Sequence, residues 1–366
     1  MRKAGVECEI FSLPLDGGHR VHRNVTSARL RSLFILGCIF AVCLVLVLEL
    51  DLSWAVLSPT ARISGTNGLW EAEWKGEDMD FWGVPGVILE KRRSLSVYEL
   101  DCSLSAFRRA VGRLFNSSKI PEHFDARERW PGLVDIQPRN QRGCGSCWAL
   151  QTTDVLSERI AIQTQGRLKP RLSAQMLISC DTTNRGCKGG YIGQAWEWLS
   201  TEGAVSERCM PYASTGEYCV QCTSRCAYGT NITLAPRLKA KMHYRVGIDI
   251  PSLLFNTGVH AIQEEILTNG PVVGGMYIYE DLFYYKRGIY THSKGEKGVS
   301  HAVKIIGWGT ENKVPYWIVQ NSWGCFWGDA GYFRIMRGVN ECAIESYVYA
   351  GIPEDLSEAR IQSYQS

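Results

Sequence analysis

The chain has 366 residues, of which 45% are hydrophobic and 21% charged, and its formal net charge is +3 at pH 7. This composition is typical of a globular protein with a large core and excludes a disordered chain. No block of basic residues stands out, so nucleic acid is not an expected partner.

The first predicted element is an unbroken apolar run of 16 residues from Leu33 to Leu48, within an N-terminal segment that we place at residues 1–57. Its length lies between a signal-peptide core and a full membrane span of roughly 20 residues. Six basic residues precede the run and would keep the N-terminus cytosolic. The length and the flanking charges of this run are consistent with a cleaved signal peptide and with an uncleaved membrane anchor. We favour cleavage, because Glu49 and Asp51 cut the run short.

Residues 58–119 have a different character. Tryptophan and phenylalanine alternate with acids at first, and Ser105 to Phe115 then predicts a short basic helix. About 60 residues with so few aliphatic side chains are unlikely to fold as an independent domain.

The stretch from Gln141 to Ala149 reads Gln-Arg-Gly-Cys-Gly-Ser-Cys-Trp-Ala and is followed by a helical pattern that Gly166 ends. Cys147 would therefore stand at a helix N-terminus. Backbone N–H groups and the helix dipole favour a negative charge there, so the position suits a nucleophilic thiolate.

Two other interpretations of the Cys144-x-x-Cys147 pair remain open at this point: a thioredoxin-like redox pair and half of a zinc site. A redox pair does not need the flanking glycines. A zinc site needs a second pair at matching spacing, which Cys219 and Cys222 offer only nominally.

A helical stretch from Ser173 to Ser179 and a glycine-rich turn from Gly186 to Tyr191 come next. The second half instead predicts short strands rich in β-branched and aromatic residues, at residues 303–307, 316–319, 331–335 and 347–350. A helix-rich first half and a strand-rich second half indicate an α+β fold.

Cysteine accounts for 14 residues, ten of them between Cys144 and Cys342, and two glycosylation sequons that follow the apolar run lie at Asn116 and Asn231. Disulfides persist, and sequons are used, in oxidising compartments. We therefore expect the chain to enter the secretory pathway.

Three motifs follow one another in a familiar order: Cys-Gly-Ser-Cys-Trp around Cys147, Ser-His-Ala around His301, and Asn-Ser-Trp-Gly beginning at Asn321. Over about residues 120–352 the chain resembles the papain-like cysteine peptidases, in particular their cathepsin B-like branch. The resemblance implies a two-lobe α+β fold for a peptidase domain at residues 120–366. The left lobe would be helical, with a central helix starting at Cys147, the right lobe β-barrel-like, and the active-site cleft between them.

The resemblance also implies the catalytic roles. Cys147 would act as a thiolate beside a His301 imidazolium, Asn321 would orient the imidazole, and Gln141 would donate to the oxyanion. No metal or cofactor is expected. An acidic lumen would keep His301 charged, so a lysosomal or extracellular location fits. The implied substrate-binding residues are Gly189, Gly190, Ser300, Ala302, Trp323 and Tyr347.

By the same resemblance, residues 58–119 would be a propeptide that keeps the enzyme inactive as a zymogen. Its tryptophans would fill the substrate cleft, and processing would occur near Lys119 or Ile120. Protein or peptide substrates and this propeptide are the expected partners. Cys219, Cys325 and Cys342 have no implied partner, and Cys147 stays free. The implied disulfides are Cys144–Cys187, Cys180–Cys222 and Cys209–Cys226.

The sequence departs from cathepsin B in two places. That protein has a long loop whose paired histidines hold the substrate carboxylate, whereas the interval from Met210 to Gln221 contains no histidine. An open-cleft endopeptidase is therefore favoured over a dipeptidyl carboxypeptidase. Tyr347 replaces the acid at the base of the P2 pocket, which predicts apolar or aromatic P2 residues rather than arginine. A catalytically silent homologue that acts as a binding or matrix protein is the rival from another class.

Overall fold

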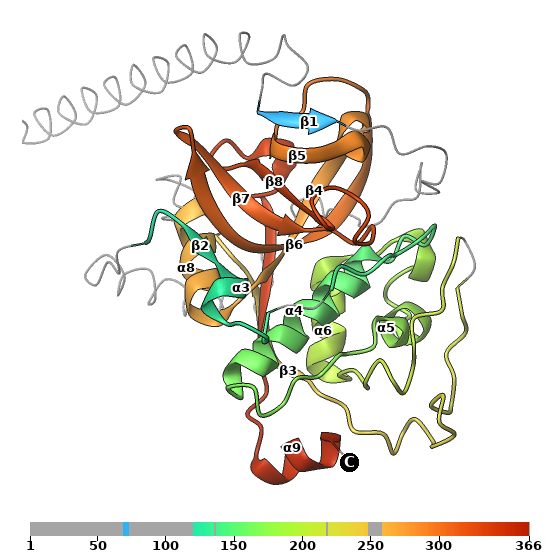
Figure 1. The fold of residues 1–366 in the computed structure, drawn as a ribbon. Coiled ribbons are helices and arrows are strands. Elements are labelled where there is room, and N and C mark those ends of the chain that lie inside the picture. Colours follow the sequence, from blue (N-terminus) through green and yellow to red (C-terminus); the bar gives the residue numbers. More distant parts are fainter. Residues whose placement is uncertain (1–68, 73–119, 135–136, 217–218, 248–257, 366) are drawn as a thin grey trace, which may run out of the picture. The chain divides into compact units, whose positions relative to one another are not determined.

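The computed structural model describes residues 69–72, 120–134, 137–216, 219–247 and 258–365 (Figure 1). All of them lie in one of the two compact units into which the chain divides, Arg62–Ser366. The apolar run from Leu33 to Leu48, the Asn116 sequon and the expected basic helix lie outside the described residues. Within the described ranges, every helix is too short or too polar to cross a lipid bilayer.

The first lobe is built around α4 (Cys147–Gln163), which is buried from Cys147 to Ala161. Gly166 ends it as predicted: its φ is +80° and its N–H bonds to the Ala161 carbonyl. α5 begins after Ser173, whose hydroxyl accepts a hydrogen bond from the Met176 N–H. The other elements of this lobe are α5 (Ala174–Cys180), η1 (Gly186–Lys188) and α6 (Ile192–Thr201).

The polar side of α4 is buried as well as its apolar side. Glu158 Oε1 lies 2.6 Å from Lys304 Nζ, and Arg159 Nη1 lies 2.9 Å from Glu265 Oε1. Lys304 and Glu265 both belong to the second half of the chain. Charged side chains are buried when they are paired in this way. The helix therefore joins the two lobes through ion pairs on one face while its apolar face fills the first lobe.

The second lobe is a nine-stranded sheet with the order β1-β5-β8-β7-β6-β4-β9-β3, in which β2 pairs with β6. Neighbours are antiparallel except for β5 and β8. The expected two-lobe fold is confirmed, although the described strands form an open path from β1 to β3 rather than a closed barrel. The strands are β1 (Trp70–Ala72), β2 (Phe124–Asp125), β3 (Ala240–Arg245), β4 (Val272–Tyr279), β5 (Tyr285–Tyr290), β6 (Lys297–Glu311), β7 (Val314–Gln320), β8 (Tyr332–Met336) and β9 (Tyr347–Pro353).

The strand ranges expected from sequence coincide with β6 to β9, whereas β3, β4 and β5 were not anticipated. β4 contains Gly274 and Gly275, which weaken the pattern of a strand. A Cβ atom at Gly274 would lie only 3.0 Å from Ile305 Cδ1, so the glycine lets β4 pack closely on β6. The remaining helical elements are α3 (Ala126–Arg129), α8 (Gly258–Asn269), η2 (Glu280–Tyr284), η3 (Glu341–Ala343) and α9 (Glu358–Gln365).

β1 comes from the segment expected to be the propeptide, and it extends the sheet at β5. Trp70 pairs with Gly288 and packs its ring 5.3 Å from Tyr290, centroid to centroid. Gly288 has a φ of +103°, and a Cβ atom there would lie 2.2 Å from the Leu69 carbonyl oxygen. Trp70 thus enters the core of the second lobe, which corrects, for this residue, the idea that the tryptophans fill the substrate cleft.

Candidate active site

Cys147 is the first residue of α4, and its side chain is fully buried. Its Sγ atom accepts a hydrogen bond from the Ala302 N–H at 3.2 Å, across 155 residues of sequence. The expected helix N-terminus is therefore present, and the sulfur lies beside β6 of the other lobe. Ala302 directly follows His301, so the strand that carries the imidazole is the strand that contacts the thiol.

His301 lies in β6, where it pairs with Met276 of β4. Its Nε2 atom is 2.7 Å from Oδ1 of Asn321, which follows the end of β7. The Asn321 oxygen also accepts from the Ser322 N–H at 2.7 Å. Because the carbonyl oxygen is an acceptor, Nε2 carries the imidazole hydrogen and Nδ1 is left as the basic atom.

Trp323 covers this pair. Its ring centroid lies 5.1 Å from that of His301, and its far side stacks on Phe283 at 4.9 Å. Trp323 is itself 5% exposed. The stack excludes water from the hydrogen bond between His301 and Asn321, as expected from the sequence.

Gln141 is held in place by both lobes. Its side-chain nitrogen donates to the Cys144 carbonyl at 3.1 Å, and its side-chain oxygen accepts from the Ser322 hydroxyl at 2.7 Å. Its backbone N–H donates to the Ser322 carbonyl at 2.8 Å. An amide nitrogen carries two hydrogens, so Gln141 has a second one for a further acceptor.

Burial is the main electrostatic influence on the thiol and the imidazole. It raises the pKa of Cys147 to about 12, while the N–H groups of Ala302, Trp148 and Cys147 act weakly in the opposite direction. It lowers the pKa of His301 to about 4, against the raising effect of the Asn321 hydrogen bond. Both shifts favour uncharged forms, because a buried charge loses its hydration. Burial therefore opposes the charged forms of both groups, whereas the hydrogen bonds from the Ala302 N–H and to Asn321 favour them.

The glycine-rich turn lies next to the nucleophile. Cys187 is joined to Cys144, and its carbonyl accepts from the Gly145 N–H at 2.8 Å. Gly189 has a φ of +95°, and a Cβ atom at Gly190 would lie 2.6 Å from the Trp148 ring. The turn is therefore restricted to glycine by its backbone and by its close approach to α4.

The other predicted substrate-binding residues belong to the second lobe. Ser300 and Ala302 flank His301 on β6; the first is half-buried and the second fully buried. Tyr347 opens β9 and is half-buried. The guanidinium of Arg245 lies 5.4 Å from the centroid of the Tyr347 ring, which sequence reasoning did not foresee.

Among the described cysteines, the disulfides are the three implied by the resemblance: Cys144–Cys187, Cys180–Cys222 and Cys209–Cys226. Cys147, Cys219, Cys325 and Cys342 are free thiols. Because Cys144 pairs with Cys187, the pair Cys144 and Cys147 forms neither a redox disulfide nor half of a zinc site. Among the described residues, the grouping with metal-like spacing is Cys144, Cys187 and Cys219, and two of its sulfurs already form a disulfide.

The described part of the histidine-free interval is fastened to α5. Gln175 Oε1 accepts from the N–H groups of Ala213 and Ser214 at 2.9 and 3.1 Å. Ser173 donates to the Met210 carbonyl at 2.6 Å. This segment therefore packs against the first lobe and brings no cationic side chain toward a substrate carboxylate.

Sequence reasoning missed the residues that hold the site together. Ser322 was read only as part of the Asn-Ser-Trp-Gly motif, and Tyr212 only as part of an interval without histidine. The Tyr212 hydroxyl in fact donates to the Gln141 carbonyl at 2.7 Å. No local pattern marks such a contact, because its partners are 71 residues apart.

Comparison with known proteins agrees with this geometry. The family described as papain family cysteine protease matches residues 120–352. Cathepsin B-like cysteine proteinase 5 of Caenorhabditis elegans is 41% identical over 273 residues, 65% of this chain and 76% of that protein. The gut-specific cysteine proteinase of the same organism is 37% identical over 247 residues, 64% of this chain and 74% of that protein.

Solved structures are similar as well. The structure of proCathepsin B S9 from Trypanosoma congolense superposes with a TM-score of 0.63 at 30% identity, covering 79% of this chain and 94% of that one. Digestive procathepsin L 3 of Tenebrio molitor larval midgut gives a TM-score of 0.51 at 24% identity over 64% of this chain and 70% of that one, a likeness of fold alone.

Proposed function

The chain belongs to the papain family of cysteine proteases, and from that premise we propose that it is an endopeptidase with Cys147 as nucleophile and His301 as acid and base. It is a cysteine peptidase made as a zymogen. In this proposal Asn321 orients the imidazole, and Gln141 together with the Cys147 N–H binds the oxyanion.

The reaction starts with transfer of the thiol proton from Cys147 to His301. The thiolate attacks the peptide carbonyl carbon, and the oxygen becomes an oxyanion. His301 returns the proton to the leaving amine, and water then hydrolyses the thioester.

One observation carries the assignment. Cys147 Sγ accepts a hydrogen bond from the N–H of Ala302, the residue after His301, and the His301 ring is hydrogen-bonded to Asn321. The test is labelling of the processed protein with a thiol-directed epoxide, followed by peptide mapping. Modification of Cys147 together with peptide turnover is expected, and both should be lost in Cys147→Ala. Cys325→Ala, which removes an exposed thiol, should keep both.

If the protein neither turns over peptides nor reacts at Cys147, the result would favour the rival hypothesis of a catalytically silent binding or matrix protein. The retention of Cys147, His301 and Asn321 at hydrogen-bonding positions supports the enzyme.

Internal cleavage is supported by the packing of residues 210–216 on α5 and by the lack of histidine between Met210 and Gln221. A peptide with an amidated C-terminus separates the two activities. An endopeptidase cleaves it as fast as the free acid, whereas a dipeptidyl carboxypeptidase needs the free carboxylate. Stepwise release of dipeptides from the free acid alone would overturn this proposal.

The P2 preference is proposed from Tyr347 and its neighbour Arg245. Tyr347 offers a ring in place of a carboxylate, and Arg245, whose Nη2 donates to the Ser346 carbonyl at 2.7 Å, adds a positive charge beside it. Both features disfavour arginine at P2. A tetrapeptide panel should be cleaved fastest with an aromatic or branched apolar P2, and fastest cleavage with arginine would contradict the proposal.

The propeptide is proposed to span residues 58–119, and β1 supports it by showing a part of this segment bound to β5. A secretory route, lysosomal or extracellular, is supported by the disulfides and by the exposed Asn231 of a sequon. N-terminal sequencing of secreted protein would report signal cleavage and the mature start together. Recovery of all the protein in a membrane pellet, with its first residues intact, would favour the anchor.

A further inference from the structure

The loop from Gln141 to Ser146 carries the proposed oxyanion donor at one end and leads into Cys147 at the other. Most polar groups of Gln141 are held by Cys144 and Ser322, as described above. The backbone carbonyl of Gln141 accepts from the Cys144 N–H at 3.3 Å and has a second, closer partner as well. It accepts from the hydroxyl of Tyr212 at 2.7 Å.

The same hydroxyl reaches the far end of the loop. Tyr212 Oη lies 2.8 Å from Oγ of Ser146, the residue before Cys147. A phenol has one hydrogen, and it is given to the Gln141 carbonyl, so the Ser146 hydroxyl is the donor in the second bond. One oxygen atom therefore links the two ends of the loop. Burial raises the pKa of Tyr212 to about 12, so the hydroxyl keeps the hydrogen that this arrangement needs.

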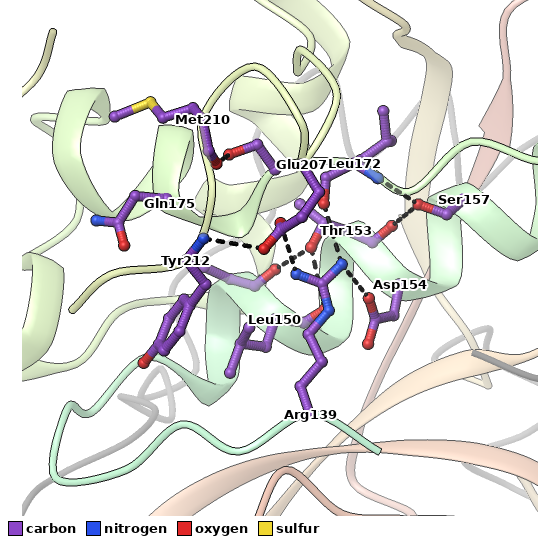
Figure 2. Close-up of polar contacts among 12 residues, drawn as sticks. Arg139, Leu150, Thr153, Asp154, Ser157, Leu172, Gln175, Glu207, Met210 and Tyr212 are labelled. Atoms are coloured by element: carbon purple, nitrogen blue, oxygen red, sulfur yellow. Dashed lines mark hydrogen bonds and ion pairs between the residues drawn. The ribbon is translucent and has the colours of Figure 1, made fainter. Parts of the chain in front are cut away.

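Tyr212 is itself fixed to α4 through a polar network (Figure 2). Its backbone N–H donates to Glu207 Oε1 at 2.9 Å, and Glu207 Oε2 accepts from Arg139 at 3.0 Å. Arg139 also pairs with Asp154 of α4 at 2.8 Å. The side chain of Arg139 is 5% exposed, so water competes little with these bonds. The tyrosine is thus tied to the helix that begins with the nucleophile.

We infer that Tyr212 is a positioning residue of the oxyanion site, which sets the Gln141 amide at its working distance from the Cys147 N–H. The inference rests on the proposed function. An oxyanion donor acts at about 2.7–3.1 Å, and a displacement of about 1 Å can reduce the rate by 10²-fold. A hydroxyl that links the carbonyl of the donor residue to the residue before the nucleophile controls that distance directly.

The variant Tyr212→Phe removes the hydroxyl and keeps the ring. We expect kcat per active site, titrated with a thiol-directed epoxide, to fall by about tenfold, with KM unchanged, because the oxyanion forms only after substrate has bound. A merely structural role would lower the titratable fraction or the melting temperature and leave kcat per site unchanged. That result would overturn the inference. Tyr228→Phe, at an exposed tyrosine, is the matched control and should leave kcat unchanged.

A double-mutant cycle with Gln141→Ala shows whether Tyr212 acts through Gln141. If it does, Tyr212→Phe changes kcat by less than about twofold in the Gln141→Ala background, because the donor that it positions is gone. An undiminished tenfold effect in that background would overturn the inference while leaving the peptidase assignment intact. A wild-type protein with no turnover and no titratable Cys147 would instead remove the proposed function, and the inference with it.

Discussion

The Nε2 atom of His301 lies 2.7 Å from the Oδ1 atom of Asn321, in a site where each residue is 1% exposed. This bond selects the tautomer that leaves Nδ1 as the basic atom, which the proposed mechanism needs. It also raises the pKa of His301, while burial lowers that pKa more strongly. The orientation and the charge of the imidazole thus depend on one neutral side chain.

Replacing Asn321 with alanine should impair both properties. We expect kcat/KM to fall by roughly ten- to hundredfold, which is part of the 10²–10⁴ that positioned acid–base groups supply. Loss of the acceptor removes an influence that raises the pKa of His301, so the alkaline limb of the pH–rate profile should move to lower pH. A profile that superposes on that of the wild type would contradict this role.

The reactivity of Cys147 in the full chain should depend strongly on pH. Burial raises the pKa of this thiol to about 12, so the thiolate is scarce at pH 7 and increases only as the solution becomes strongly alkaline. Alkylation of Cys147 by iodoacetamide in the full chain should therefore be slow at pH 7 and accelerate above it. The exposed Cys325 of the same sample is the reference. Equal rates for the two thiols at pH 7 would show that burial does not control Cys147.

His301 should make the full chain less stable in acid. Its pKa is lowered from 6.5 to about 4, so the unfolded chain takes up a proton at a higher pH than the folded chain does. The stability that neutral His301 contributes is complete above pH 6.5 and is lost as the pH falls to 4. The full difference is on the order of 3 kcal/mol. Urea unfolding of Cys147→Ala at pH 7.5 and 4 should show this loss, and addition of His301→Asn should remove most of it.

Breaking the buried ion pair Lys304–Glu158 should lower the free energy of unfolding more than breaking an exposed ion pair with the same N–O distance. Both its members are 1% exposed and 2.6 Å apart. Lys304→Met should cost about 3–5 kcal/mol, because it leaves Glu158 charged and buried. The double variant with Glu158→Leu should cost less. Lys241→Met, which breaks the exposed pair with Asp355, also at 2.6 Å, should cost about 1 kcal/mol or less. Similar losses at the two sites, measured by urea unfolding, would contradict this account.

Gly288→Ala should weaken the attachment of β1. The added Cβ atom would lie 2.2 Å from the Leu69 carbonyl oxygen, so the strand must shift away from β5. If residues 58–119 inhibit the zymogen, the unprocessed variant should cleave a fluorogenic peptide faster than the unprocessed wild type. Gly338→Ala is the control, since its φ is also positive, at +92°, but no atom lies within 4 Å of the added Cβ. Equal latency in both variants would argue that β1 has no part in inhibition.

Much of the fold could be predicted from sequence because its signals are local. The cap at Ser173, the stop at Gly166 and the β-branched runs of β6 and β7 each lie within a few residues. β4 was missed because Gly274 and Gly275 interrupt its pattern, and Gly274 allows the close packing of β4 on β6. The open path of the sheet could not be predicted either, since strand order depends on pairing between distant segments.

The amino-acid sequence by itself determined the identity, order and spacing of Cys147, His301 and Asn321, and hence the class of chemistry. Only the tertiary structure decided how deeply they are buried, because burial is a property of the packed lobes and not of any motif. It also decided which groups hold Gln141 and why the polar face of α4 is buried. These contacts join residues 71 to 181 positions apart, such as Tyr212 with Gln141 and Ser322 with Gln141. Local patterns extend over a few residues, whereas such contacts exist only once distant segments have folded against one another.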